Sequence, residues 1–178
     1  MLKKIVSGGQ TGVDRGALEL AIELGIPHGG FCPKGRRSED GRVPAIFQLE
    51  ETSSPHYPAR TALNVGLGDG TLLVVRGKEG YARSRGTKLT REIAEKKGKP
   101  WRAADPRLES QIVKVADWIL EFEIEILNVA GPRESTNPGI QVETCDFLRR
   151  IIGKLREFGS TSGNSITELF EKHPTEKK

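Results

Sequence analysis

Three glycines follow the first apolar run of the chain. From Lys4 to Gly16 the sequence reads KIVSGGQTGVDRG, so the apolar run passes through Gly8, Gly9 and Gly12 into a pattern typical of an amphipathic helix. A turn between a strand and a helix directs backbone N–H groups at whatever lies above the sheet edge. The junction therefore predicts a site for a phosphate-like anion. Its glycine spacing is neither that of the dinucleotide fingerprint nor that of a P-loop, so it does not identify the ligand.

Two other segments combine glycine, arginine and hydroxyl side chains after an apolar run. Segment 76–90 contains SRGT at 84–87, and segment 131–139 reads GPRESTNPG. Because the carboxyl ends of parallel strands meet at one sheet edge, we expect these segments and the first loop to form one anion-binding crevice. The open alternatives are a tight turn that binds nothing for the first loop and a solvated basic loop for the second.

The candidate ligand-binding residues fall into three groups. The first loop contributes Gly8, Gly9, Gln10, Thr11, Gly12, Asp14 and Arg15; the basic turn at 34–37 contributes Lys34 and Arg36; and segments 76–90 and 131–139 contribute Arg85, Gly86, Thr87, Gly131, Arg133 and Ser135. Backbone N–H groups at 8–12 would donate hydrogen bonds, basic side chains would pair with the charge of the ligand, and the hydroxyls would add donors. The open alternative for Asp14 is that it only caps the helix, with its carboxylate committed to backbone N–H groups, whereas Arg15 is free to reach the anion.

No catalytic residue and no metal ligand is predicted. The chain has no Ser/His/Asp or Cys/His pairing at a recognised spacing, and two cysteines give neither a disulfide framework nor a metal-binding cluster. Cys32 stands near Lys34 and Arg36, where its pKa could be lowered. We favour the alternative, a buried thiol that serves packing.

The elements that position these residues alternate between strands and helices. Strands are predicted at 3–7, 28–32, 71–75, 100–104 and 125–130, with a minor strand at 46–49. Helices are predicted at 14–24, 57–67, 88–97, 106–122 and 139–158. This alternation predicts an α/β fold, a three-layer α/β/α sandwich around a mostly parallel sheet of about five strands.

Length and composition predict a single domain. With 178 residues, of which 35% are hydrophobic, the chain fits one ligand-binding domain at 1–158 and a polar tail at 159–178, either mobile or docked on a partner. We expect no membrane segment and no signal peptide, and a cytoplasmic location. The net charge of +4 and the lack of stacking aromatics make nucleic acid an unexpected partner.

Four motifs resemble a known family. They are SGGQTGVDRGAL from Ser7, GIPHGGFCPKGRR from Gly25, Arg60-Thr61-x-x-Asn64-Val65, and LNVAGPRES from Leu127. Together they are similar to the putative molybdenum carrier proteins, over about residues 3–154. The resemblance implies a Rossmann-like domain related to the LOG phosphoribohydrolases and to the DNA-processing DprA proteins. It also implies a homo-oligomer that binds molybdenum cofactor (molybdopterin), a phosphorylated pterin with a dithiolene, and holds it for transfer.

The same resemblance also indicates an enzyme as an alternative. Phosphoribohydrolases of the LOG type carry the motif P-G-G-x-G-T-x-x-E, whose glutamate serves catalysis. Here the corresponding segment is SRGTKLT, and Thr90 stands in place of the glutamate. The substitution favours a binding or carrier protein over an enzyme. A LOG-like nucleotide phosphoribohydrolase and a nucleotide-sensing module remain the alternatives.

Overall fold

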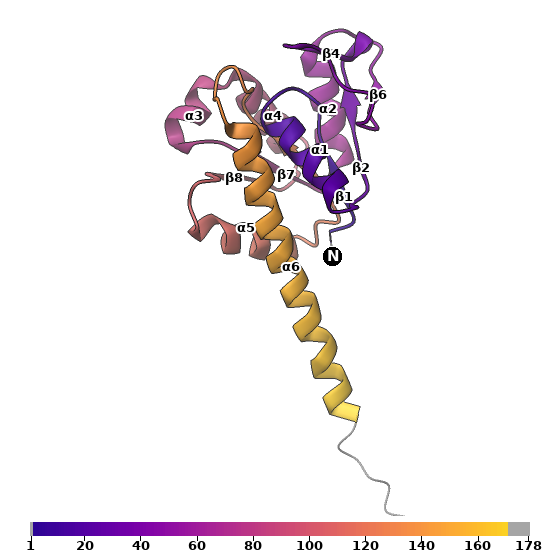
Figure 1. Ribbon diagram of the computed structural model, residues 1–178, viewed down its shortest axis with the longest axis vertical. Coiled ribbons are helices and arrows are strands. Elements are labelled where there is room, and N and C mark those ends of the chain that lie inside the picture. The colour runs from indigo at the N-terminus through magenta and orange to yellow at the C-terminus, as the bar shows by residue number, and fades with distance from the viewer. Residues whose placement is uncertain (1, 171–178) are drawn as a thin grey trace, which may run out of the picture.

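A five-stranded parallel sheet forms the centre of the protein. The computed structural model describes residues 2–170 (Figure 1). Its strands lie in the order β2-β1-β9-β7-β8. Their bounds are Lys4–Val6 for β1, His28–Gly29 for β2, Gly70–Val74 for β7, Trp101–Ala104 for β8 and Ile126–Ala130 for β9. Every residue of β7 is buried, as its continuous apolar run predicts for a strand covered on both faces.

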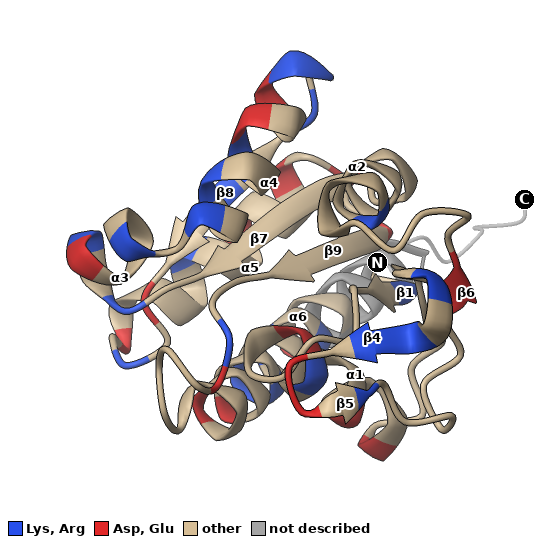
Figure 2. Cartoon of the chain, turned by 90° about the horizontal axis from the view of Figure 1, so that it is seen from above, with Lys and Arg blue, Asp and Glu red and all other residues tan. Residues whose placement is uncertain are grey.

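Helices cover both faces of the sheet. Their bounds are Val13–Glu23 for α1, Tyr57–Leu67 for α2, Gly77–Arg83 for α3, Arg85–Lys96 for α4, Ser110–Glu121 for α5 and Ile140–Phe170 for α6. Helices α1, α5 and α6 pack together on one face and share the main hydrophobic core with the sheet. Helices α2 and α4 pack against each other on the other face (Figure 2). The predicted three-layer Rossmann-like sandwich is confirmed.

The strand order is that of a doubly wound sheet whose first unit has moved along the chain. If β9 is taken as the first strand, the order becomes the familiar 3-2-1-4-5, with β1, β2, β7 and β8 following in sequence. The strand–helix unit that normally opens such a fold, β9 with α6, therefore comes last here. The order reverses between β9 and β7, which is where doubly wound sheets bind their ligands.

Between β2 and α2 the chain makes small additional elements. The predicted strand at 28–32 is divided by Gly30, whose φ of +124° turns the chain out of the main sheet. The second part, β3 (Phe31–Cys32), pairs with β6 (Glu50–Glu51), so the minor strand predicted at 46–49 is wrong. The segment between β3 and β6 contains the short helix η1 (Lys34–Arg36) and the hairpin of β4 (Arg37–Ser38) and β5 (Gly41–Arg42).

Four helices differ from the sequence-based expectation, and one of them, α4, begins at Arg85 instead of 88. The basic segment after β7 contains α3 instead of a loop. Helix α5 begins at Ser110 instead of 106, because Asp105 accepts hydrogen bonds from the backbone and side chain of Arg107 in a local turn. Helix α6 continues without a break beyond 158 to Phe170. Residues 171–178 of the predicted tail lie outside the described residues, so mobility or docking of the tail stays a prediction.

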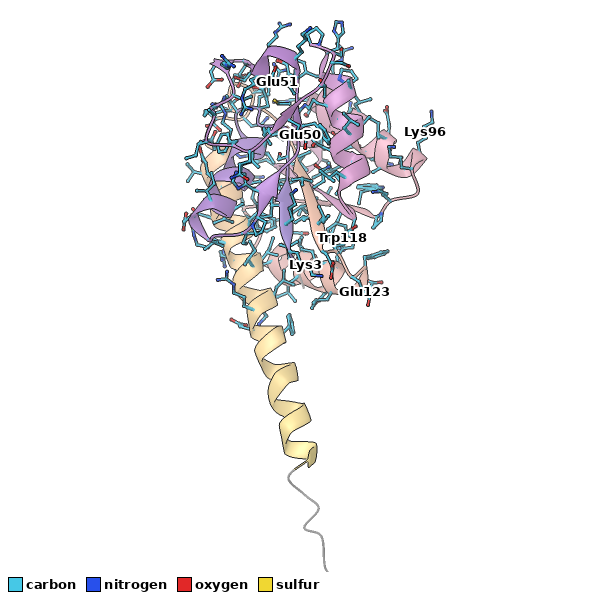
Figure 3. The ribbon with its side chains drawn as sticks, turned by 90° about the vertical axis from the view of Figure 1, so that its right-hand side faces the viewer. Lys3, Glu50, Glu51, Lys96, Trp118 and Glu123 are labelled. Carbon is cyan, nitrogen blue, oxygen red and sulfur yellow. The ribbon has the colours of Figure 1, made fainter. Side chains whose placement is uncertain are left out.

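The carboxyl edge of the sheet faces away from the projecting part of α6. Lys3, which precedes β1, lies at the end of the body from which α6 projects, whereas Glu51 lies toward the opposite end (Figure 3). The loops that follow β1, β7 and β9 thus gather on the side remote from the C-terminal half of α6. In the part of the chain that the structure describes, no helix is both long enough and apolar enough to cross a membrane.

Candidate functional site

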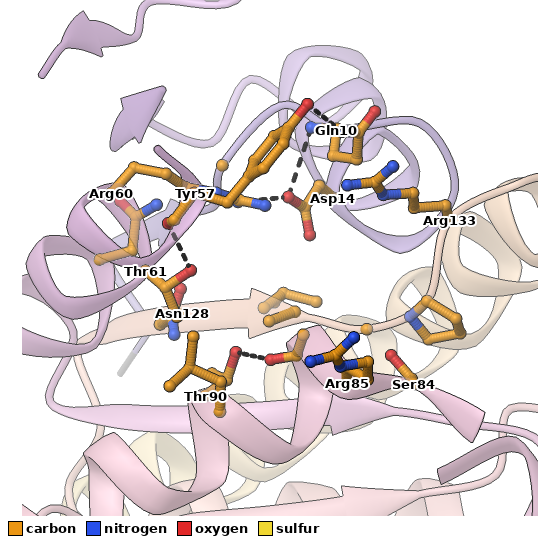
Figure 4. Close-up of a pocket in the computed structure, with 18 of the residues that line it drawn as sticks. Gln10, Asp14, Tyr57, Arg60, Thr61, Ser84, Arg85, Thr90, Asn128 and Arg133 are labelled. Atoms are coloured by element: carbon orange, nitrogen blue, oxygen red, sulfur yellow. Dashed lines mark hydrogen bonds and ion pairs between the residues drawn. The ribbon is translucent and has the colours of Figure 1, made fainter. Parts of the chain in front are cut away.

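A crevice opens at the carboxyl edge of the sheet, at the reversal of strand order. It has a volume of about 300 Å³, which is at the lower end of the range for small-molecule sites. Its walls come from the first loop, α2, the junction of α3 and α4, and the end of β9 (Figure 4). The lining residues are Gly8, Gln10, Asp14, Tyr57, Arg60, Thr61, Asn64, Arg83, Ser84, Arg85, Gly86, Leu89, Thr90, Asn128, Val129, Ala130, Gly131, Pro132, Arg133 and Thr136.

Positive charge dominates the crevice. Four of its lining residues are arginines, at positions 60, 83, 85 and 133, and Asp14 is the one carboxylate among the described lining residues. Arg133 lies over the ring of Tyr57 at 5.0 Å and is 3.9 Å from Glu39. Arg85 stands on the opposite wall from Arg133 (Figure 4). Two arginines on facing walls favour an anionic ligand between them.

The start of α4 adds backbone donors to this wall. Ser84 caps the helix by accepting from the backbone N–H of Thr87 at 3.3 Å, and its Oγ lies 2.6 Å from Thr87 Oγ1. The preceding N–H groups, of Arg85 and Gly86, belong to the first turn and have no acceptor within the helix. A Cβ atom built on Gly86 would meet no atom within 4 Å, so the space beside the helix start is open. The positive end of the helix dipole favours an anion there.

The first loop satisfies much of its own hydrogen bonding. The N–H groups of Gln10, Thr11 and Gly12 donate to the side chains of Asp14, Gln10 and Gln141, at 3.3, 3.1 and 3.2 Å. Three of the five backbone donors expected from the sequence are therefore directed at the chain itself. Asp14 does not cap α1, whose first turn has no side-chain cap; it accepts from the N–H of Gln10, three residues before the helix, and pairs with Arg60 at 2.7 Å.

Arg15 does not enter the crevice. Its guanidinium donates to both oxygens of Asp40 at 2.5 and 2.7 Å, to Ser38 Oγ and to the carbonyl of Gly9. The hydrogen bond from Arg15 is the main cause that lowers the pKa of Asp40 to about 2. Arg15 therefore does not line this crevice, and its side chain holds the β4–β5 hairpin against the first loop.

Two other basic residues expected at the ligand also lie elsewhere. Arg36 donates to the backbone carbonyls of residues 43, 44, 47 and 49, so it holds that loop together. Lys34 is exposed on η1 and does not line the crevice. Cys32 is buried, and burial raises the pKa of its thiol, which agrees with a packing role.

Glu39 joins the two loops that flank the crevice. It accepts from the hydroxyls of Thr11 and Ser135, which come from the first loop and from the segment after β9. Burial raises the pKa of Glu39, but the hydrogen bonds from Ser135 and Thr11 outweigh burial and lower it. Neither hydroxyl lines the crevice, and Thr87 is buried at the start of α4. These residues hold the walls instead of facing the cavity.

The structure thus brings together part of the predicted set. The predicted residues that line the crevice are Gly8, Gln10, Asp14, Arg85, Gly86, Gly131 and Arg133. Those that do not line it are Gly9, Thr11, Gly12, Arg15, Lys34, Arg36, Thr87 and Ser135.

Helix α2 supplies a wall of the crevice whose residues are absent from the predicted ligand-binding set. Tyr57, Arg60, Thr61 and Asn64 recur at helical spacing and face the crevice. This spacing, together with the Arg60-Thr61-x-x-Asn64 motif, was the available signal. Asn64 Oδ1 accepts from the backbone N–H of Phe31 at 2.7 Å, and Asn64 Nδ2 donates to the carbonyl of Phe31 at 3.0 Å. These two hydrogen bonds hold α2 against β3.

Comparison with known proteins gives two matches. The family model described as the circularly permutated YpsA SLOG family matches residues 5–152. A crystal structure of a putative molybdenum carrier protein from Syntrophus aciditrophicus SB is 41% identical, with a TM-score of 0.77, and the alignment covers 84% of this chain and 94% of that chain. No curated protein matches the chain.

Proposed function

The chain belongs to the circularly permuted YpsA SLOG family, and on that premise we propose that it binds a phosphorylated planar heterocycle, with molybdopterin as its cargo. The position of the β9–α6 unit at the end of the fold agrees with a permuted family. The resemblance to molybdenum carrier proteins that the sequence motifs indicated is confirmed by the 41% identical structure. A cytoplasmic location and a homo-oligomer stay predictions.

The observation that carries the proposal is the charge of the crevice. Four arginines face one carboxylate, and the first turn of α4 presents its N–H groups beside Arg85. A phosphate group at this point would receive hydrogen bonds from the backbone and charge from two walls. The site lies where a doubly wound sheet places its ligand.

The rest of the lining suits a flat ring. Tyr57, Leu89, Val129 and Pro132 contribute apolar surface to the same cavity. The Tyr57 ring already has the guanidinium of Arg133 at 5.0 Å and that of Arg60 at 5.8 Å, an arrangement in which planar cations and aromatic groups attract each other. A pterin or purine offers both the ring and the phosphate that these two regions would bind.

Holding the ligand is better supported than cleaving it. Asp14 is engaged by Arg60 and by the N–H of Gln10, so it is poorly placed to serve as a free general base. Thr90, which stands where a LOG-type enzyme has glutamate, donates its hydroxyl to the carbonyl of Gly86 at 2.8 Å. These contacts support a carrier over a LOG-like phosphoribohydrolase.

Calorimetric titration with molybdopterin and, separately, with AMP tests the proposal. We expect saturable binding of a phosphorylated heterocycle and no release of adenine when AMP is incubated with the protein. Absence of binding to both compounds would overturn the proposal. Release of adenine on repeated turnover would replace the carrier with a phosphoribohydrolase. A partner captured only in the presence of ligand would favour the sensing module.

A further inference from the structure

Gly8 packs directly against an arginine side chain. A Cβ atom built on Gly8 would lie 1.3 Å from Nη1 and 2.3 Å from Cζ of Arg60, so the guanidinium occupies the space that any other residue would fill. The φ angle of Gly8 lies outside the left-handed region, unlike those of Gly9 and Gly12. Backbone conformation therefore does not require glycine at position 8, but any larger residue there would displace the guanidinium of Arg60 from its present position.

Arg60 is held in this position by Asp14. Its Nη1 donates to Asp14 Oδ2 at 2.7 Å, and the side chains of Arg60 and Asp14 are 14% and 5% exposed. The Nε atom of Arg60 is buried without a hydrogen-bond partner. A buried donor left unpaired is costly and occurs where something else requires the arrangement. Both side chains line the crevice, so the arrangement is part of the wall that a ligand would meet.

The position of Arg60 changes the role expected of the glycine-rich loop. Glycine at a strand–helix junction usually lets a phosphate approach the backbone. Here the guanidinium covers Gly8, and the N–H groups of residues 10–12 donate to side chains of the chain itself. A ligand on this side of the crevice would therefore meet the Arg60 side chain before the backbone of the loop.

We propose that Arg60 binds an acceptor oxygen of the ligand in the inner part of the crevice, and that Gly8 and Asp14 are its positioning residues. This inference rests on the proposed function. Gly8 leaves room for the guanidinium of Arg60. Asp14 fixes the orientation of that guanidinium by accepting from one of the five N–H donors of Arg60. The chemistry selected is an oxygen acceptor, charged or neutral, on a ligand whose phosphate lies at the start of α4.

A double-mutant cycle separates this role from a direct role of the loop backbone. Binding of molybdopterin and of AMP is titrated for the wild type, for Gly8→Ala, for the Asp14→Asn/Arg60→Ala variant and for the combination of all three changes. The paired change avoids leaving a buried carboxylate without a partner. Gly153→Ala, on α6, is the matched control, since its Cβ would meet no atom within 4 Å.

For whichever of the two compounds the wild type binds, we expect Gly8→Ala and Asp14→Asn/Arg60→Ala each to weaken binding about tenfold or more, the value of a hydrogen bond to a charged group. In the Asp14→Asn/Arg60→Ala background, adding Gly8→Ala should change affinity by less than about twofold, because the side chain that it displaces is absent. Gly153→Ala should bind as the wild type does.

Two results would overturn the inference. Equal losses from Gly8→Ala in both backgrounds would show that the loop backbone itself contacts the ligand. Unchanged affinity in Asp14→Asn/Arg60→Ala would remove Arg60 from the site.

If the wild type binds neither AMP nor molybdopterin, the proposed function fails and the ligand role of Arg60 fails with it. Thermal unfolding then tests the packing alone: Gly8→Ala should lower the melting temperature in the wild-type background and leave it nearly unchanged in the other.

Discussion

Arg15 offers a test that separates stability from ligand binding. Replacing it with alanine removes a buried side chain that donates to Asp40, Ser38 and the carbonyl of Gly9. Because none of these contacts lies in the crevice, we expect Arg15→Ala to lower the free energy of unfolding and to leave AMP affinity within about twofold. Arg85→Ala, at the exposed start of α4, should weaken AMP binding and leave the free energy of unfolding nearly unchanged.

The size of the stability loss follows from two contributions. The pKa of Asp40 falls from 3.8 to about 2, mainly through its hydrogen bond with Arg15. At full strength this fall corresponds to about 2.4 kcal/mol. The Asp40 side chain is 47% exposed, so screening by solvent reduces the contribution to about 1 kcal/mol. The hydrogen bond to Gly9 adds about 1 kcal/mol, giving about 2 kcal/mol in all.

Urea unfolding at pH 7 and at pH 2 separates the contribution of the Arg15–Asp40 pair, which depends on pH, from that of the hydrogen bond to Gly9. Because Asp40 has a lowered pKa in the folded state, its stabilisation is fully present above pH of about 4 and is lost as pH falls through about 2. The difference in stability between wild type and Arg15→Ala should therefore narrow by most of 1 kcal/mol at pH 2. At pH 7 the melting temperature should fall by about 4–8 °C. An unchanged stability together with a loss of AMP binding would refute this reasoning and return Arg15 to the ligand.

Three further predictions concern single residues. Arg85→Ala should weaken AMP binding about tenfold without lowering the melting temperature, and the remaining affinity should depend less on salt, as calorimetry at two salt concentrations can measure. Gly131→Ala should destabilise the fold by about 1–3 kcal/mol in urea unfolding, because its Cβ would lie 2.4 Å from the carbonyl of Val74 and 2.5 Å from Val13; a change below about 0.5 kcal/mol would contradict this packing. Cys32 should react with a thiol reagent at pH 7 only on unfolding, since burial raises its pKa and covers its sulfur; rapid labelling of Cys32 in the native protein would count against that burial.

The main sheet and its helices were accessible from sequence because their signals are local. A continuous apolar run predicted β7, and Gly25 and Gly98, with φ of +64° and +63°, mark the ends of α1 and α4 as expected of left-handed helix caps. The convergence of three loops followed from the rule that parallel strands end at one edge. Seven of the predicted residues do line the crevice.

The partners of individual charges were not accessible in the same way. Arg15 and Arg60 are both arginines near the first loop in space, yet one pairs with Asp40 and the other with Asp14, 46 positions away in sequence. No periodicity encodes such pairs, because they depend on how the β4–β5 hairpin and α2 pack on the loop. The same holds for Glu39, whose hydroxyl partners are 28 and 96 positions away.

The most direct test of the central claim is native mass spectrometry of the protein mixed with molybdopterin. The wild type should show one bound molecule per chain, and the Arg85→Ala/Arg133→Ala variant, which lacks a cation on each facing wall, should show none at the same concentration. Equal binding by both proteins, or none by either, would contradict the assignment of this crevice as the cargo site.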